Sequence, residues 1–292
     1  MTHLLRRAAA PLFTATGLLL AASAHAEMPR PWQMGMQQAA SPVQESVQSL
    51  NDIVLVIITL ITVFVAGLLG WVAFRYSAKR NPVASQNSHN TMLEIAWTMI
   101  PVLILVGIAI PSFRLVYFED RTREADITIK VTGHQWYWEY DYGSVAKVDF
   151  NSNAIKEEDL KPGQLRLLDV DNQLVVPAGK NVRVLTTSGD VIHSFFIPSL
   201  GVQRYAIPGR TIETWFKVNA PGVYYGECNQ ICGTNHSQMP IVIHAMPESE
   251  FQAWLTTAKT KFADAAPAAA ASPQKLAGET APQSYAIAQI QR

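Results

Sequence analysis

Residues 228–239, Cys-Asn-Gln-Ile-Cys-Gly-Thr-Asn-His-Ser-Gln-Met, combine side chains suited to metal chemistry. Cys228 and Cys232 are the only cysteines of the chain, and His236 and Met239 follow them within the same segment. A second imidazole, His193, lies upstream in the sequence Asp-Val-Ile-His-Ser. Thiolate, imidazole and thioether ligands together suit copper better than magnesium, calcium or iron. Because one copper needs only one thiolate, two cysteines in one segment predict a dinuclear copper centre that transfers electrons.

Two other interpretations of the cysteines stay open at this point. In an exported protein, two cysteines often form a disulfide, although a gap of three residues is short for one. A zinc site of two cysteines and two histidines is also common, but this cysteine spacing is unusual for a zinc finger. Neither alternative uses Met239, and the disulfide uses neither histidine.

The N-terminus resembles an export signal. Arg6 and Arg7 precede an uncharged stretch over residues 8–24, and Ala-His-Ala at 24–26 fits the rule for signal cleavage. We predict a signal peptide over residues 1–26 with cleavage before Glu27. The alternative is an uncleaved membrane helix.

Two uncharged apolar stretches, residues 53–74 and 95–113, are long enough to cross a bilayer as helices. Pro101 and Pro111 interrupt the second, but membrane helices tolerate proline where neighbours satisfy the freed carbonyls. We predict a hairpin of helices over about 50–76 and 93–117 within residues 27–118; two buried soluble helices are the alternative. Arg75, Lys79 and Arg80 lie between the spans, so this connection is expected on the cytoplasmic side and the C-terminal region outside.

Residues 119–260 are predicted to form a domain of many short strands. Alternating or β-branched stretches occur at 127–131, 182–186, 211–218, 223–225 and 241–243, with Pro-Gly turns between several of them. This pattern is typical of a β-sandwich or barrel. A helix is expected over 248–261, and residues 261–292, rich in alanine, proline and glutamine, are predicted to be a disordered tail. The fold class is thus an α+β membrane protein, and the chain's net charge of zero gives no reason to expect a nucleic-acid partner.

These residues together resemble subunit II of bacterial haem-copper cytochrome c oxidases. The likeness covers about residues 46–255. It is carried by the 228–239 segment, by Gly-His-Gln-Trp-Tyr-Trp at 133–138, by Asp-Val-Ile-His-Ser-Phe-Phe-Ile-Pro-Ser-Leu-Gly at 190–201, by Leu-Arg-Leu-Leu-Asp-Val-Asp-Asn at 165–172 and by Ile-Pro-Gly-Arg at 207–210. The resemblance implies a two-helix membrane hairpin followed by a cupredoxin-like Greek-key β-domain on the periplasmic side of the bacterial inner membrane.

The resemblance also implies a cofactor, the binuclear copper centre CuA. Cys228 and Cys232 would bridge both coppers. His193 and Met239 would be the further ligands of one copper. His236 and the backbone carbonyl of Gln230 would be the further ligands of the other. The function implied is electron input to a terminal oxidase. The chain would accept electrons from cytochrome c and pass them to haem in subunit I, where oxygen reduction and proton pumping are expected.

The aromatic segment 133–142 is assigned two roles. Trp138 and Tyr137 are expected to be packing residues of a strand, whereas Trp136 matches the surface tryptophan at which the family accepts electrons. Residues 119–255 carry 12 basic and 17 acidic side chains, a net charge of −5 that favours a cationic partner. By resemblance, the carboxylates expected to dock cytochrome c are those of Glu139, Asp141, Asp171 and Asp190.

Three positions concern a second metal or a proton path. The family has a glutamate that helps to bind Mg²⁺ or Mn²⁺ at the contact with subunit I, but this chain has Gln230 there. An amide oxygen carries no charge, so a hard cation should bind more weakly at Gln230. Glu227 would replace the missing carboxylate; the alternative is that Glu227 is only a surface charge. Glu94 matches a family residue near a proton path into subunit I, although a solvated anchor at the membrane boundary is equally consistent with it.

Other classes of copper protein fit less well. A quinol-oxidase homologue would lack the copper ligands, and a nitrous oxide reductase copper domain would lack the hairpin and the tryptophan-rich segment. A copper chaperone or storage protein would favour exposed ligands. The chain has no Cys-x-x-Cys-His, so a fused c-type haem is excluded and the donor should be a separate cytochrome c. Subunit I, other oxidase subunits and membrane lipid are the further expected partners.

Overall fold

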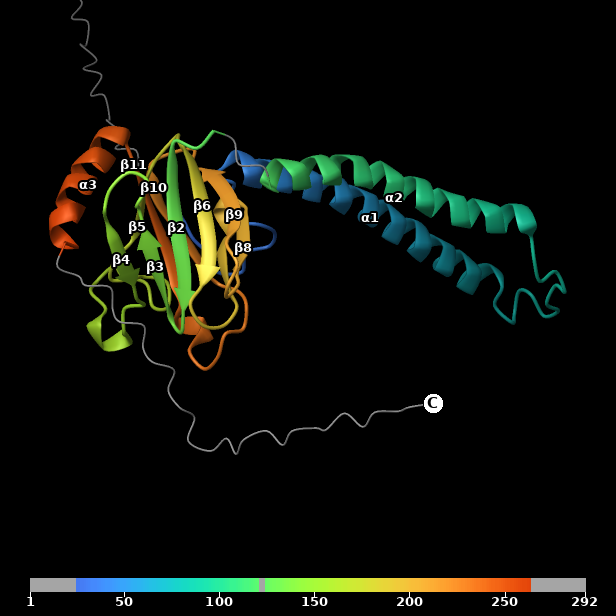
Figure 1. Ribbon diagram of the computed structural model, residues 1–292. Helices are drawn as coiled ribbons and strands as arrows, with labels where there is room; N and C mark the ends of the chain where they lie inside the picture. The colour runs from blue at the N-terminus through green and yellow to red at the C-terminus, as the bar shows by residue number, and fades with distance from the viewer. Residues whose placement is uncertain (1–24, 121–123, 264–292) are drawn as a thin grey trace, which may run out of the picture.

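The computed structural model describes residues 25–120 and 124–263, which form a helical hairpin and a β-sandwich (Figure 1). Residues 1–24 of the predicted signal peptide and residues 264–292 of the predicted tail lie outside the described residues. The last two residues of the predicted signal peptide, His25 and Ala26, are described and belong to strand β1 (His25–Glu27). The hairpin helices are α1 (Pro42–Arg75) and α2 (Thr91–Asp120), which run side by side away from one side of the sandwich. A third helix, α3 (Glu248–Lys261), lies along the opposite side of the sandwich, and the sequence predicts this helix.

The hairpin helices are longer than the sequence predicts. α1 begins at Pro42 rather than near residue 50, because Ser41 caps it by accepting a hydrogen bond from the Gln44 amide at 3.0 Å. α2 continues through Pro101 and Pro111. Both helices have the length and apolar composition of membrane spans, and the most apolar stretch of each helix is not buried in the structure.

The sandwich consists of two sheets. One has the order β5-β11-β10-β7-β8 with β1 also paired to β10, and the other has the order β4-β3-β2-β6-β9. The first sheet contains β1 (His25–Glu27), β5 (Leu174–Pro177), β7 (His193–Ile197), β8 (Val202–Ala206), β10 (Gly222–Cys228) and β11 (Pro240–Met246). The second contains β2 (Ile127–His134), β3 (Tyr137–Asp141), β4 (Asp149–Ser152), β6 (Asn181–Ser188) and β9 (Ile212–Lys217).

The predicted strands form because their alternate side chains share one buried face. In β6, every second residue from Val182 to Ser188 is buried, and Ile129 and Val131 of β2 are fully buried beside them. Trp138 and Tyr140 of β3 are also fully buried, which confirms the prediction that Trp138 is a packing residue. Burial of such apolar surface from both sheets is the main stabilising contribution to the domain.

Specific contacts attach the hairpin to the sandwich. The Ser41 hydroxyl donates to the Leu200 carbonyl at 2.6 Å. Trp215 Nε1 of β9 donates to the Phe118 carbonyl of α2 at 3.1 Å, and the two rings pack edge to face. The position of the sandwich against the outer end of the hairpin is therefore fixed by both helices.

Candidate metal centre

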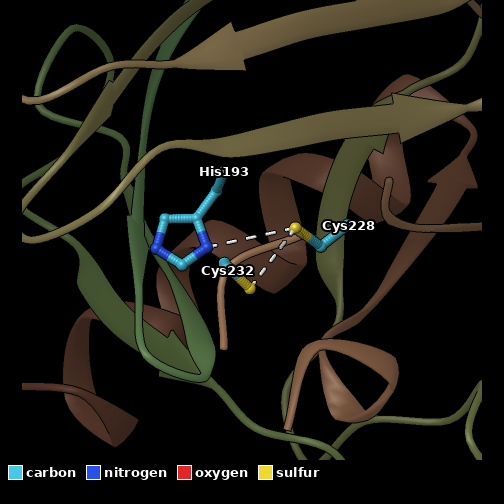
Figure 2. Close-up of side chains that lie close together, drawn as sticks. All are labelled: His193, Cys228 and Cys232. Atoms are coloured by element: carbon cyan, nitrogen blue, oxygen red, sulfur yellow. Dashed lines mark hydrogen bonds between the residues drawn. The ribbon is translucent and has the colours of Figure 1, made fainter. Parts of the chain in front are cut away.

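The two cysteine sulfurs lie close together at one end of the first sheet (Figure 2). Cys228 is the last residue of β10, and Cys232 follows in the loop after it. Their Sγ atoms are 3.9 Å apart, far beyond the roughly 2.05 Å of a disulfide bond, and both are free thiols. The structure therefore does not adopt the disulfide alternative.

His193 reaches the same point from the neighbouring strand. β10 and β7 are antiparallel with Cys228 opposite Phe195, so His193 at the start of β7 lies beside the loop that leaves β10. His193 Nδ1 is 3.9 Å from Cys228 Sγ (Figure 2). The ligand atoms of His193, Cys228 and Cys232 all lie within 4.8 Å of one another, and all three residues are buried.

The other imidazole and a carbonyl complete the cluster. His236 Nδ1 is 3.5 Å from Cys232 Sγ, and the Gln230 carbonyl oxygen is 3.4 Å from Cys228 Sγ. Each sulfur thus has an imidazole nitrogen near it. Met239 is buried, and its carbonyl accepts a hydrogen bond from the Cys228 amide at 3.1 Å. All six sequence-predicted ligands therefore belong to one end of the sandwich.

The protonation of His193 suits a ligand. Its ring is fully buried, and this burial lowers its pKa, only partly offset by the carboxylate of Asp190. Nε2 lies 2.8 Å from Asp190, so the neutral tautomer that donates from Nε2 leaves Nδ1 free to bind a metal. Such a carboxylate–imidazole pair is the usual way in which a metal-binding histidine is oriented.

The Cys232 thiol is protonated in the absence of a positive charge. Burial, and the adjacent Cys228, raise the pKa of Cys232 to about 12. A thiolate at Cys232 therefore needs a cation beside it. Two sulfurs flanked by two imidazole nitrogens in an apolar setting fit a soft or borderline metal such as copper.

The loop that bears Trp136 covers the cysteine loop. The Gln135 side-chain amide donates to the Cys232 carbonyl at 2.7 Å, and the Gln135 backbone amide donates to Asp190 at 2.7 Å. A Cβ added to Gly233 would lie 3.0 Å from the Trp136 ring, so the half-buried indole packs directly on the cysteine loop. The motif at 133–138 indicates Trp136, but no pattern in the sequence indicates the contacts of Gln135 or Gly233.

The four predicted docking carboxylates differ in their surroundings. Glu139 binds His134 Nε2 at 2.9 Å, and this hydrogen bond lowers its pKa. Asp190 binds His193. Asp141 accepts a hydrogen bond from the amide of Gly143 two residues later, whereas Asp171 accepts hydrogen bonds from Asn153 in a different segment of the chain. Asp190 therefore orients a residue of the cysteine cluster in addition to placing a negative charge at the surface.

The residues predicted for a second metal and for a proton path lie in three different surroundings. Glu227 is exposed on β10, where its side chain alternates with that of buried Cys228. Gln230 is half-buried, and its carbonyl is the group beside Cys228. Glu94 lies in the first turn of α2, at the opposite end of the hairpin from the sandwich.

Comparison with known proteins gives consistent matches. The family described as "Cytochrome C oxidase subunit II, periplasmic domain" matches residues 127–246, and "Cytochrome C oxidase subunit II, transmembrane domain" matches residues 29–115. A "Probable cytochrome c oxidase subunit 2" of Rickettsia bellii is 49% identical over 86% of this chain and 94% of its own. One of Rickettsia felis is 48% identical over 82% of this chain and 76% of its own.

One solved structure is also similar. It is the periplasmic domain of subunit II of the cytochrome oxidase of Bradyrhizobium japonicum, 48% identical, which covers 49% of this chain and 99% of its own with a TM-score of 0.46.

Proposed function

The chain belongs to the cytochrome c oxidase subunit II family, the electron-input subunit of haem-copper terminal oxidases, and on this premise we propose how it performs that role. It accepts electrons from cytochrome c at Trp136, holds them on a CuA centre, and passes them to haem in subunit I. Oxygen reduction and proton pumping then take place in that partner subunit. The location is the bacterial inner membrane, with the sandwich on the periplasmic side.

The observation that carries this proposal is the pairing of sulfur and nitrogen. Cys228 and Cys232 lie 3.9 Å apart, and each has the Nδ1 atom of a different histidine beside it. A structural zinc site needs only four such ligands, but here the Gln230 carbonyl also lies beside Cys228, and the buried Met239 is joined to Cys228 through its backbone carbonyl. Cys228, Cys232, His193 and His236, with Met239 and the Gln230 carbonyl, would hold the copper, which would supply a one-electron carrier at this site.

The residues of the chain hold this site in place. Cys228 and His193 are fixed by neighbouring strands, and His193 is oriented by Asp190. The β-scaffold therefore resists ligand movement in either redox state. Trp138 packs against the rings of His193 and Phe195 and keeps water away from the interior side.

Trp136 is suited to accept an electron because its indole contacts the cysteine loop at Gly233 and remains partly exposed. The carboxylates of Glu139, Asp141, Asp171 and Asp190 give the domain an acidic surface for a basic cytochrome c. With a net charge of −5 over residues 119–255, association should be fast and weakened by salt.

Two further roles extend the proposal. Gln230 and Glu227 would form at most a weak Mg²⁺ or Mn²⁺ site at the contact with subunit I, because Gln230 is uncharged and Glu227 points outward from β10. Glu94 would lie near the start of a proton path, on the cytoplasmic side to which Arg75, Lys79 and Arg80 assign the hairpin connection.

The experiment is copper loading of a soluble fragment over residues 119–265, with metal analysis and an electron paramagnetic resonance spectrum. Two coppers per chain and a seven-line signal from one electron shared over two nuclei are expected. The Cys232→Ser variant should lose this signal, and Asp171→Asn, which leaves the cluster intact, should keep it. A four-line signal from one copper, preferential binding of zinc, or a disulfide under these loading conditions would overturn the proposal.

A further inference from the structure

A groove of about 470 Å³, lined by charged and hydroxyl side chains as well as apolar ones, lies between α1 and α2, close to the sandwich. Ile53 and Pro111 line it, together with Arg114 and Glu45. The uncharged apolar stretches of the two helices end at Ile53 and Phe113, so the groove lies at the level where hydrocarbon gives way to lipid headgroups. Charged groups at this depth meet phosphates and water rather than acyl chains.

Arg114 is the cation of this groove. Among the residues that the structure describes, it makes no hydrogen bond or ion pair. A guanidinium group presents paired donors that match the oxygens of a phosphate, and it retains its charge at any physiological pH. An arginine at headgroup level without a protein partner is therefore suited to bind a phosphodiester.

Hydroxyl groups and one carboxylate face the same groove. Ser46 and Ser49 line it, and the Ser46 hydroxyl donates to the Pro42 carbonyl, which leaves its oxygen free to accept. Glu45 Oε1 accepts a hydrogen bond from Asn219 of the sandwich at 2.8 Å, so this carboxylate is held at the rim. The groove thus offers both a cation and an anion that do not pair with each other within the structure.

An apolar groove of about 460 Å³ continues along the hairpin toward the cytoplasmic side. Its walls are aliphatic, with Ile57 and Leu60 of α1 facing Ile104 and Ile108 of α2, and Ile53 lines both grooves. Gly107 removes a side chain from this wall. The two grooves together have the form of a headgroup site with an acyl-chain channel beneath it.

We propose that the hairpin binds one phosphatidylethanolamine molecule from the outer leaflet. Its phosphate pairs with Arg114, its ammonium group with Glu45, and an acyl chain lies against Ile57 and Ile104. A zwitterionic headgroup fits the two opposite charges, whereas the anionic headgroup of phosphatidylglycerol leaves Glu45 without a cation.

The placement of Arg114 on α2 favours lipid over a helix of another subunit. Glu94 and Arg114 are twenty residues apart, so at 3.6 residues per turn their side chains leave α2 on roughly opposite sides. If Glu94 faces subunit I, as proposed above, Arg114 faces away from that subunit. A partner helix would also have to bury the charge of Arg114 against apolar side chains, which is costly.

The test uses the assembled oxidase complex with a photoreactive benzoylphenylalanine in place of Ile57. Irradiation in membranes that contain both phosphatidylethanolamine and phosphatidylglycerol, followed by mass spectrometry of this subunit, identifies what occupies the groove. We expect an adduct with the mass of phosphatidylethanolamine. The same probe at Leu69, outside the groove, should give lower yield and no headgroup preference.

Variants then test the two charges. Arg114→Gln should lower the phosphatidylethanolamine adduct about tenfold, as expected for one lost charge-assisted contact. The matched control Arg75→Gln, at the other membrane surface, should leave it unchanged. Glu45→Gln should shift the adducts toward phosphatidylglycerol. A polypeptide adduct at Ile57 of the otherwise unaltered chain, or equal lipid adducts with and without Arg114, would overturn the proposal.

Discussion

His193 and Asp190 form a pair in which the imidazole Nε2 lies 2.8 Å from the carboxylate, while Nδ1 of the same ring faces Cys228 Sγ at 3.9 Å. The same carboxylate accepts the backbone amide of Gln135, one residue before Trp136. Although burial opposes its ionisation, the hydrogen bonds from His193, Val191 and Gln135 hold the pKa of Asp190 below its ordinary value. One carboxylate therefore connects a proposed copper ligand with the loop that would receive electrons.

The first prediction concerns this charge. Asp190→Asn should keep two coppers bound, because an amide oxygen can still accept from Nε2. Loss of a negative charge beside His193 should raise the reduction potential by roughly 50 mV, because the oxidised centre carries more positive charge. Redox titration of the copper absorption measures this. Asp171→Asn is the control, since Asp171 bonds Asn153 instead, and an equal shift in both variants would refute a specific role for Asp190.

The second prediction concerns Gly233, which has a φ of +123° and contacts Trp136. In Gly233→Ala, the new methyl group should displace the indole and slow electron transfer from cytochrome c. The backbone conformation alone should cost about 1 kcal/mol of unfolding free energy. Gly163→Ala is a matched control, because Gly163 has a φ of +91° and no atom within 4 Å of an added Cβ. Stopped-flow kinetics should show slowing in Gly233→Ala only.

The third prediction concerns Trp136 itself. Trp136→Ala should slow electron transfer from cytochrome c severely and leave the copper content and the resonance spectrum unchanged, because Trp136 supplies no ligand atom. Tyr137→Phe, which keeps the ring stacked on His134, should transfer electrons at the normal rate. Rapid-mixing kinetics at several ionic strengths provide the measurement. An unaltered rate in Trp136→Ala would assign electron input to another residue.

The fourth prediction concerns the pH dependence of copper binding. With a pKa of about 12, the Cys232 thiol is protonated near neutral pH until a metal binds, so binding must release its proton. Apparent copper affinity should therefore increase with pH, by about tenfold per pH unit for each proton released. Competition with a chelator of known affinity measures the slope. Cys232→Ser should reduce that slope, and a pH-independent affinity would contradict the mechanism.

The fifth prediction concerns acid stability. The hydrogen bond from His134 holds the pKa of Glu139 below its ordinary value. A depressed pKa stabilises the folded domain above the unfolded-state value of about 4.3, and this stabilisation is lost as pH falls through the folded value.

Glu139→Gln should therefore be less stable than the unaltered domain near neutral pH, and the difference should shrink below about pH 4. The effect should be small, since the side chain is 36% exposed. Urea unfolding at several pH values measures it, with exposed Glu250→Gln on α3 as the control. A difference that grows on acidification would contradict the assignment.

Much of the molecule follows from local patterns in the sequence. Uncharged stretches of about twenty residues predict membrane helices whatever surrounds them, and alternation predicts strands such as β6, in which one face is buried. The spacing of Cys228, Cys232, His236 and Met239 predicts a soft-metal site because these residues are adjacent in the chain. Ser41 and the helical residues after it were missed, since their helix is stabilised by contacts with Leu200 and Gly201 far along the chain.

Only the tertiary structure determines which distant groups meet. His193 reaches Cys228 because β7 pairs with β10, and Gln135 reaches Cys232 because the turn after β2 crosses over the cysteine loop. The groove of Arg114 exists only where α1 lies against α2. Sequence patterns report the environment of each residue along its own helix or strand. Contacts between elements depend instead on strand pairing and helix packing, and these are determined by interactions throughout the folded chain.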